Sequence, residues 1–170
     1  MVKKLLFILL LFSNKYFASV QTRIKVDVLI VIDSYDTVKE SVLNHIKQYE
    51  KNHKNVVGLT GYGHKTYSDS IINLSEKQAD SLLRIDFEKC IDIVPDSYNE
   101  YQKLFVAAFI YNCGRGTFAK CLSGRKRMID VCRYKEKEHR KLKERRIFEQ
   151  QGINKYKKIY TINNKNFKNL

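Results

Sequence analysis

Apolar residues recur at helical spacing in the first well-patterned segment of the chain. Between residues 38 and 49 they fall three or four positions apart and would share one face of a helix: Val38, Val42, Leu43, Ile46 and Tyr49. Residues 37–40 have the spacing of a helix-capping box, with Asp36 as a competing cap. This pattern predicts an amphipathic helix that ends near Glu50.

Glu50 follows Ile46 by four residues, so it belongs to the apolar face of this helix, as does His53. Burial and the helix dipole both disfavour a negative charge at the carboxyl end of a helix. A glutamate kept uncharged in this way can serve as a general acid. The alternative is an ordinary solvated glutamate in the last helical turn.

A short apolar segment with three glycines follows, and it ends in His64. Gly58, Gly61 and Gly63 predict a small hairpin or a close approach of the backbone to a ligand. A plain β-turn is the alternative, because nearby glycines alone are weak evidence.

A second amphipathic helix is predicted to begin with a capping box at residues 75–78. Asp86 falls within its apolar face, and a carboxylate among core positions needs a partner. We predict that His64 is this partner and that the pair fixes the hairpin to the second helix. The apolar face comprises Ala79, Leu82, Leu83, Cys90 and Val94.

The third predicted helix opens at Asp96 and Ser97 and is apolar on almost every side from residue 104 to 111, as expected of a central buried helix. Gly114 suits its C-cap. The strongly basic residues 124–146 contain intermittent apolar positions and predict two short helices. Residues 151–170 lack clear periodicity, which predicts a loosely packed basic tail.

The amino terminus has a basic start followed by a short apolar run, which is typical of a secretory signal peptide over residues 1–20. A retained N-terminal anchor is the alternative. Residues 21–35 form a lead-in segment, and its β-branched part, residues 26–32, predicts either a strand or an apolar connection.

Four segments, taken in order, resemble the phage-type lysozymes, glycoside hydrolase family 24. A fifth, residues 145–149, resembles the closing R-R-x-x-E of that family less strongly. The resemblance is closest to compact lysozyme-like proteins of Bacteroides-type conjugative elements. In those proteins a Y/F-E-x-x-H motif, like residues 49–53 here, leads directly to a G-Y-G-H turn. The four segments are Glu50, residues 61–64 (GYGH), residues 74–86 and residues 107–116.

The resemblance implies an α+β, mainly helical, lysozyme-like fold over residues 36–150, with a small hairpin lobe and a larger helical lobe. It implies hydrolysis of the β-1,4 bond between N-acetylmuramic acid and N-acetylglucosamine, with Glu50 as general acid and no cofactor or metal. Tyr62, Gly63 and Asn112 would line the sugar cleft, and His64 and Asp86 would support it. Asn112 has the alternative of capping its own helix.

The sequence departs from the family in one respect that concerns the reaction. The family has a second acid and a threonine in its hairpin, whereas residues 51–66 contain no Asp or Glu. Glycosidases normally use two carboxyl groups. The role of the second carboxyl group would fall to His53 assisting Glu50, to Thr60 holding a water molecule, to a carboxylate from elsewhere, or to no residue. His53 could equally be a surface or packing histidine, and the protein could be a weak or inactive peptidoglycan-binding or conjugation scaffold.

The formal net charge of +14 and the pI near 9.6 are large for 170 residues. A basic surface would concentrate an exported, periplasmic or secreted enzyme on the anionic cell envelope and its peptidoglycan strands. Conjugation or secretion machinery is a further candidate partner. The positive charge could instead serve nucleic-acid binding or reflect compositional drift, although a signal peptide argues against nucleic acid as the partner. We expect the protein to be a monomer. Four cysteines permit disulfides in an exported protein but show no zinc-site spacing.

Overall fold

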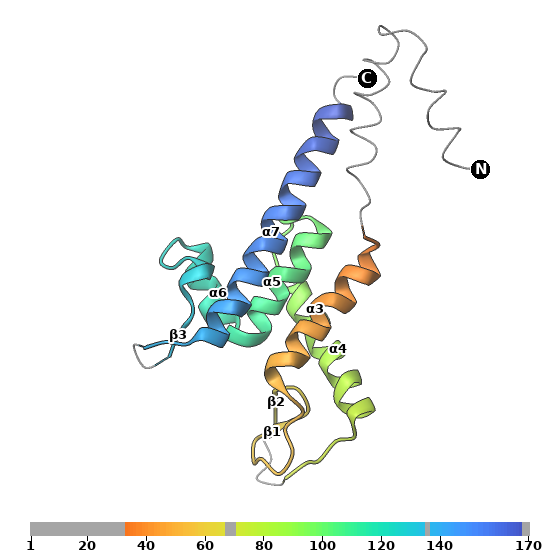
Figure 1. Cartoon of the computed structure of the whole chain (residues 1–170), viewed down its shortest axis with the longest axis vertical. Coiled ribbons are helices and arrows are strands. Elements are labelled where there is room, and N and C mark those ends of the chain that lie inside the picture. The colour runs from red at the N-terminus through yellow and green to blue at the C-terminus, as the bar shows by residue number, and fades with distance from the viewer. Residues whose placement is uncertain (1–32, 67–70, 135–136, 168–170) are drawn as a thin grey trace, which may run out of the picture. The chain divides into compact units, whose positions relative to one another are not determined.

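The computed structural model describes residues 33–66, 71–134 and 137–167, without the side chains of residues 133–138 and 160–167. The predicted signal peptide and residues 26–32 lie outside this description. Figure 1 shows the elements, which in chain order are α3 (Tyr35–Glu50), β1 (Leu59–Thr60), β2 (His64–Lys65), α4 (Glu76–Asp92), α5 (Glu100–Cys113), α6 (Arg115–Leu122), the 3-10 helix η1 (Met128–Asp130), β3 (Arg133–Tyr134), β4 (Lys137–Glu138) and α7 (Arg140–Phe167).

Helix α3 buries the face that the sequence predicts. Its core positions are Val38, Val42, Leu43 and Ile46. The cap is different from the prediction, because Ser34 accepts a hydrogen bond from the backbone N–H of Thr37 at 3.2 Å. The helix therefore starts one turn earlier than a cap at Thr37 would require.

Helix α4 begins with the predicted capping box, in which Ser75 and Gln78 exchange side-chain and backbone hydrogen bonds. Its fully buried residues are Ala79, Leu83 and Phe87. Phe87 is a core residue that the sequence pattern did not include. Leu82 is only partly buried.

Helix α5 is the centre of the core and packs against α3, α4, α6 and α7 (Figure 1). Every side chain from residue 104 to 110 is buried, which confirms the predicted central helix. The helix begins at Glu100 rather than near Asp96, because Asn99 and Gln102 form a capping box there.

The small lobe is built on the two-residue strands β1 and β2, which pair antiparallel with Thr60 opposite His64. Gly61 and Gly63 have φ angles of +54° and +94° in the turn between them, a region that residues with a Cβ seldom adopt. The backbone N–H of His53 donates to the Gly61 carbonyl at 2.7 Å, which fixes the chain leaving α3 against the turn.

The basic segment does not form the two short helices that were predicted. It contains η1, the antiparallel pair β3 and β4, and the first turns of α7. Its apolar residues are too few and too widely spaced to bury a helical face before α7 begins.

The prediction of a loosely packed tail from residue 151 is also wrong. Helix α7 continues through it, and Ile153 and Tyr156 are buried in the core. A Cβ at Gly152 would lie 2.2 Å from the Phe105 ring. The absence of a side chain at residue 152 therefore lets α7 approach α5 closely.

All four cysteines are free thiols, and Cys132 is buried. No helix in the described part of the chain combines the length and apolar character needed to cross a membrane.

Candidate active site

Glu50 lies at the end of α3, where the helix meets the hairpin lobe, and its side chain is 21% exposed. Its Oε1 accepts a hydrogen bond from Arg145 Nη1 at 2.6 Å and another from Asn112 Nδ2 at 3.1 Å. The sequence analysis predicted a desolvated, uncharged carboxyl. The Glu50 side chain is partly buried and lies against a guanidinium that the sequence analysis did not place there. Its uncharged state stays a prediction.

The other carboxyl oxygen of Glu50 faces the hairpin. A Cβ at Gly63 would lie 3.7 Å from Oε2. Among the described residues, no hydrogen bond to Oε2 is formed, so one oxygen of this carboxyl is anchored and the other remains available. Gly63 keeps the approach to that second oxygen free of a side chain.

Arg145 is held in place by more than Glu50. Its side chain is only 5% exposed, and its guanidinium lies over the Tyr49 ring, 5.5 Å from the ring centroid. Its buried Nη2 has no partner among the described residues. A buried cation in contact with an aromatic face and one carboxylate is a strongly constrained neighbour for Glu50.

A second layer of polar side chains lies behind Asn112. Arg146 Nη2 donates to Asn112 Oδ1 at 3.0 Å and to Glu149 Oε1 at 2.8 Å. Arg146 also lies over the Phe109 ring and donates to the Cys113 sulfur. Asn112 is thereby oriented with its amide N–H₂ toward Glu50 instead of capping its own helix, which ends with the Gly114 N–H bonded to the Ile110 carbonyl.

Glu149 is 2% exposed, and its Oε2 has no partner among the described residues. Burial raises the pKa of Glu149 from 4.5 to about 8, although Arg146 and Arg145 act in the opposite direction. The network behind Glu50 therefore contains an acid that can hold a proton near neutral pH.

The predicted pair of His64 and Asp86 forms, with 2.5 Å between His64 Nδ1 and Asp86 Oδ2. It joins β2 to α4 and so fixes the hairpin to the helical lobe. A second tie comes from the Tyr111 hydroxyl, which donates to the Tyr62 carbonyl at 2.5 Å. Burial raises the pKa of Tyr111, which keeps this donor protonated.

Tyr62 is partly buried at the turn, and its phenol donates to Glu76 Oε2 at 2.8 Å. Burial and this hydrogen bond raise the pKa of Tyr62 to about 12. Its carbonyl and its hydroxyl both form hydrogen bonds to neighbouring elements, and its contact with a sugar stays a prediction.

Thr60 does not occupy the position that its predicted role requires. It is 2% exposed, and its hydroxyl donates to the Ile72 carbonyl at 2.7 Å. Because the side chain is almost fully buried and its proton is donated inside the lobe, the structure contradicts the prediction that Thr60 holds a water molecule at Glu50. Its alternation with Leu59 along β1 places it on the inner face.

His53 is partly buried and enters the hairpin through its backbone bridge to Gly61. Within the described residues, no polar contact joins its ring to Glu50. Its role as a helper of Glu50 stays a prediction.

The sequence analysis did not assign Arg145, Arg146 or Glu149 to the site. The available signal was the R-R-x-x-E motif, which the resemblance identified without a role. Among the described residues, no group of three or more His, Cys, Asp or Glu side chains is arranged to hold a metal ion.

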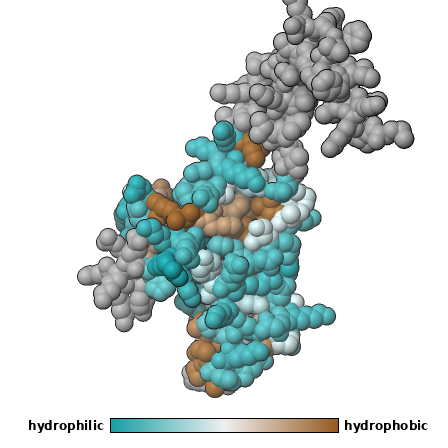
Figure 2. Space-filling model, viewed as in Figure 1, coloured by the Kyte–Doolittle hydropathy of each residue, from teal (hydrophilic) through white to brown (hydrophobic). Residues whose placement is uncertain are grey.

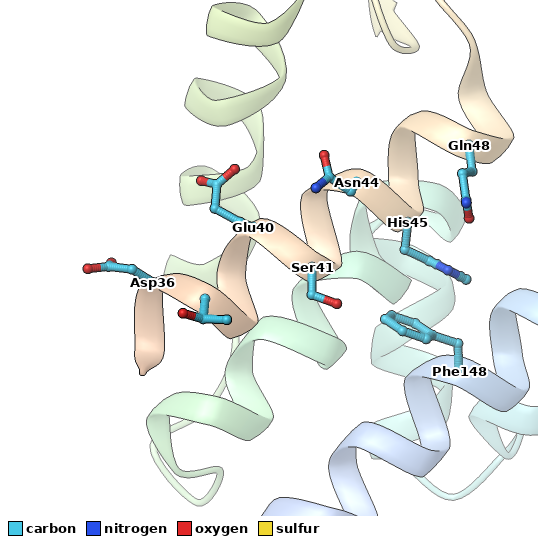
Figure 3. A pocket seen from close by; sticks show the side chains of 8 residues that line it. Asp36, Glu40, Ser41, Asn44, His45, Gln48 and Phe148 are labelled. Atoms are coloured by element: carbon cyan, nitrogen blue, oxygen red, sulfur yellow. The ribbon is translucent and has the colours of Figure 1, made fainter. Parts of the chain in front are cut away.

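A separate cavity of about 800 Å³ lies along α3, and Glu50 does not line it (Figure 3). Its lining includes the His45 ring stacked on Phe148, with 3.7 Å between the ring centroids. Burial, followed by the charges of Arg145 and Arg146, lowers the pKa of His45 to about 4. The rest of its wall is polar and comes mainly from the face of α3 that is directed away from the core.

The comparisons with known proteins agree with this architecture. The muramidase domain of SpmX from Asticaccaulis excentricus is similar in structure, with a TM-score of 0.50 over 66% of this chain and 94% of that domain. The sequence identity is 18%, so the likeness concerns the fold. No family model and no curated protein matches the sequence. The chain has a lysozyme-like fold, mainly helical with a small two-stranded antiparallel hairpin.

Proposed function

We propose that this protein is a muramidase that cleaves the β-1,4 bond between N-acetylmuramic acid and N-acetylglucosamine, with Glu50 as the general acid. The observation that supports this most strongly is the arrangement of the Glu50 carboxyl in a lysozyme-like fold. One oxygen is fixed by Asn112 and Arg145, and the other faces the glycine turn of the hairpin.

In this proposal the proton resides on Oε2 and passes to the glycosidic oxygen of the leaving sugar. The hydrogen bonds to Oε1 fix the carboxyl plane, so Oε2 is aimed along the open side next to Gly63. The Arg145 guanidinium, bonded to Oε1 at 2.6 Å, would stabilise the negative charge that develops on the carboxyl as its proton is transferred.

The second half of the reaction is assigned to a water molecule. Residues 51–66 supply no carboxylate that could form a covalent glycosyl intermediate. Direct attack by water on the opposite face of the sugar, with release of its proton to bulk solvent, then inverts the anomeric configuration. The predicted cleft residues Tyr62, Gly63 and Asn112 would contact the sugar, with His64 and Asp86 holding the hairpin.

A non-hydrolytic role is the second candidate, and two observations favour it. Residues 51–66 lack the second carboxylate, and the Thr60 hydroxyl is buried and bonded to the Ile72 carbonyl. Such a protein would bind peptidoglycan strands as a scaffold in the cell envelope, with conjugation or secretion machinery as the candidate partner. Export by the predicted signal peptide would serve both the muramidase and the scaffold. So would attraction of the protein's net positive charge to the anionic envelope.

Release of new reducing ends from purified peptidoglycan distinguishes the two candidates. The wild type is compared with Glu50→Gln and with the control Glu88→Gln, which alters a surface carboxyl paired with Lys39. The muramidase proposal predicts release that falls about 100-fold or more in Glu50→Gln only. Binding of peptidoglycan with no release by any variant would support the scaffold.

A further inference from the structure

Four exposed aliphatic side chains gather at the end of the hairpin lobe. Their exposed fractions are 36% for Val56, 57% for Val57, 52% for Ile71 and 38% for Ile72. Figure 2 shows an apolar patch at this end of the molecule, where β1 and β2 lie in Figure 1. We call these four residues the aliphatic tip.

The aliphatic tip is held in a defined shape. Val57 and Ile71 form an antiparallel bridge that brings the two chain segments together. Below it, the Asn55 backbone N–H donates to Asn73 Oδ1 at 2.8 Å, and the two side chains share a second hydrogen bond at 3.0 Å. The bridge and these hydrogen bonds therefore hold the four aliphatic side chains together while they are exposed.

The lobe that carries the aliphatic tip is basic. Lys51, Lys54 and Lys65 are exposed on the same lobe. Residues 51–75 contain these three lysines and one acid, Asp69, in a chain whose net charge is +14. Exposed apolar side chains on a lobe with exposed lysines match an anionic bilayer surface, where the hydrocarbon accepts the apolar part and the headgroups accept the ammonium groups.

We propose that the aliphatic tip docks into the surface of an anionic lipid bilayer. Glycan strands present hydroxyl and amide groups and offer no hydrocarbon interior for four aliphatic side chains. Two copies of the tip placed face to face would bring their lysines together, which disfavours a symmetric dimer through this patch. The proposal is independent of the muramidase reaction.

A single tryptophan gives a local readout, because the chain contains none. Val57→Trp places the reporter at the aliphatic tip, and the matched control Ile85→Trp places it at an equally exposed position on α4, where Ile85 is 54% exposed. A local reporter is needed because the apolar N-terminal run of the full chain could bind vesicles by itself. Vesicles with and without phosphatidylglycerol, otherwise phosphatidylcholine, are added to each full-length variant.

The proposal predicts a blue shift of the emission maximum and protection from an aqueous quencher for Val57→Trp, only with phosphatidylglycerol vesicles. Adding Ile71→Glu should abolish the shift, whereas adding Ile85→Glu should leave it, with the same far-ultraviolet circular dichroism in both. An unshifted Val57→Trp or an equal shift in Ile85→Trp would overturn the proposal. So would a shift caused by protein concentration or peptidoglycan without vesicles.

Discussion

Arg145 Nη1 lies 2.6 Å from Glu50 Oε1, which joins the first turns of α7 to the end of α3 across 95 positions of sequence. This contact determines how the candidate acid is presented, because it occupies one carboxyl oxygen and leaves the other facing Gly63. It also makes the carboxyl-terminal helix part of the site.

Replacement of Arg145 by methionine should destabilise the fold. The substitution leaves Glu50 with Asn112 as its remaining partner, and we expect a loss of about 2–3 kcal/mol in the free energy of unfolding. A double-mutant cycle with Glu50→Gln, measured by urea denaturation, should give a coupling energy of about 1–2 kcal/mol.

Arg127→Met is the matched control, since Arg127 forms an exposed pair with Asp130. Its unfolding midpoint should equal that of the wild type. Additive effects of the Arg145 and Glu50 substitutions would contradict the contact.

Glu149 should make stability depend on pH. Its pKa is raised from 4.5 to about 8, so the folded protein binds more protons than the unfolded chain between those values. The contribution of this group to stability is present below pH 4.5 and is lost as the pH rises toward 8. The free energy of unfolding of Glu149→Gln, minus that of the wild type, should therefore increase with pH across this window, by up to about 1.4 kcal/mol per unit.

Urea denaturation at several pH values measures that difference. Asn154→Ala changes an exposed residue of the same helix without altering a titrating group, so its difference from the wild type should not vary with pH. A Glu149→Gln difference that decreases as the pH rises would show that the ionised carboxylate stabilises the fold.

The helical core was largely predictable because its signal is local. The buried face of α3, the Ser75 capping box and the apolar stretch of α5 are each contained within one segment at the expected spacing. The pair of His64 and Asp86 was predictable for a related reason, since a carboxylate in an apolar face requires a partner nearby.

The roles of Arg145 and Arg146 could not be read in this way. In a segment rich in Lys and Arg, nothing in spacing or composition distinguishes a buried arginine from a solvated one. The extent of α7 was missed because its core residues, Ile153 and Tyr156, stand among many polar residues and give no clear helical periodicity. Tertiary packing on α5 stabilises this helix more than its own pattern does.

Gly152→Ala should disrupt the packing of α7 on α5. The added methyl group would lie 2.2 Å from the Phe105 ring, which is itself buried, so either the ring or the helices must move. We expect a loss of about 1–3 kcal/mol in the free energy of unfolding. Thermal denaturation measures it.

Gly116→Ala is the matched control within another helix. A Cβ there meets nothing within 4 Å, so the change should be neutral or stabilising by about 0.5 kcal/mol. Equal effects of the two substitutions would be inconsistent with close packing at Gly152.

Thr60→Val should lower stability without altering catalysis. It removes the hydrogen bond to the Ile72 carbonyl, at an expected cost of about 1 kcal/mol. The rate of reducing-end release per folded molecule should be unchanged, because the Thr60 hydroxyl is not available to a water at Glu50. Thr60→Ser, which keeps the hydroxyl, is the control. A large fall in rate for Thr60→Val with intact folding would restore a catalytic role for this residue.

The most direct measurement of the central claim is the rate of reducing-end release from purified peptidoglycan by the wild type and by Glu50→Gln, with folding checked by circular dichroism. The muramidase account predicts measurable release by the wild type and a loss of about 100-fold or more when the Glu50 carboxyl becomes an amide. Equal release by the two folded proteins, or none by the wild type, would contradict it.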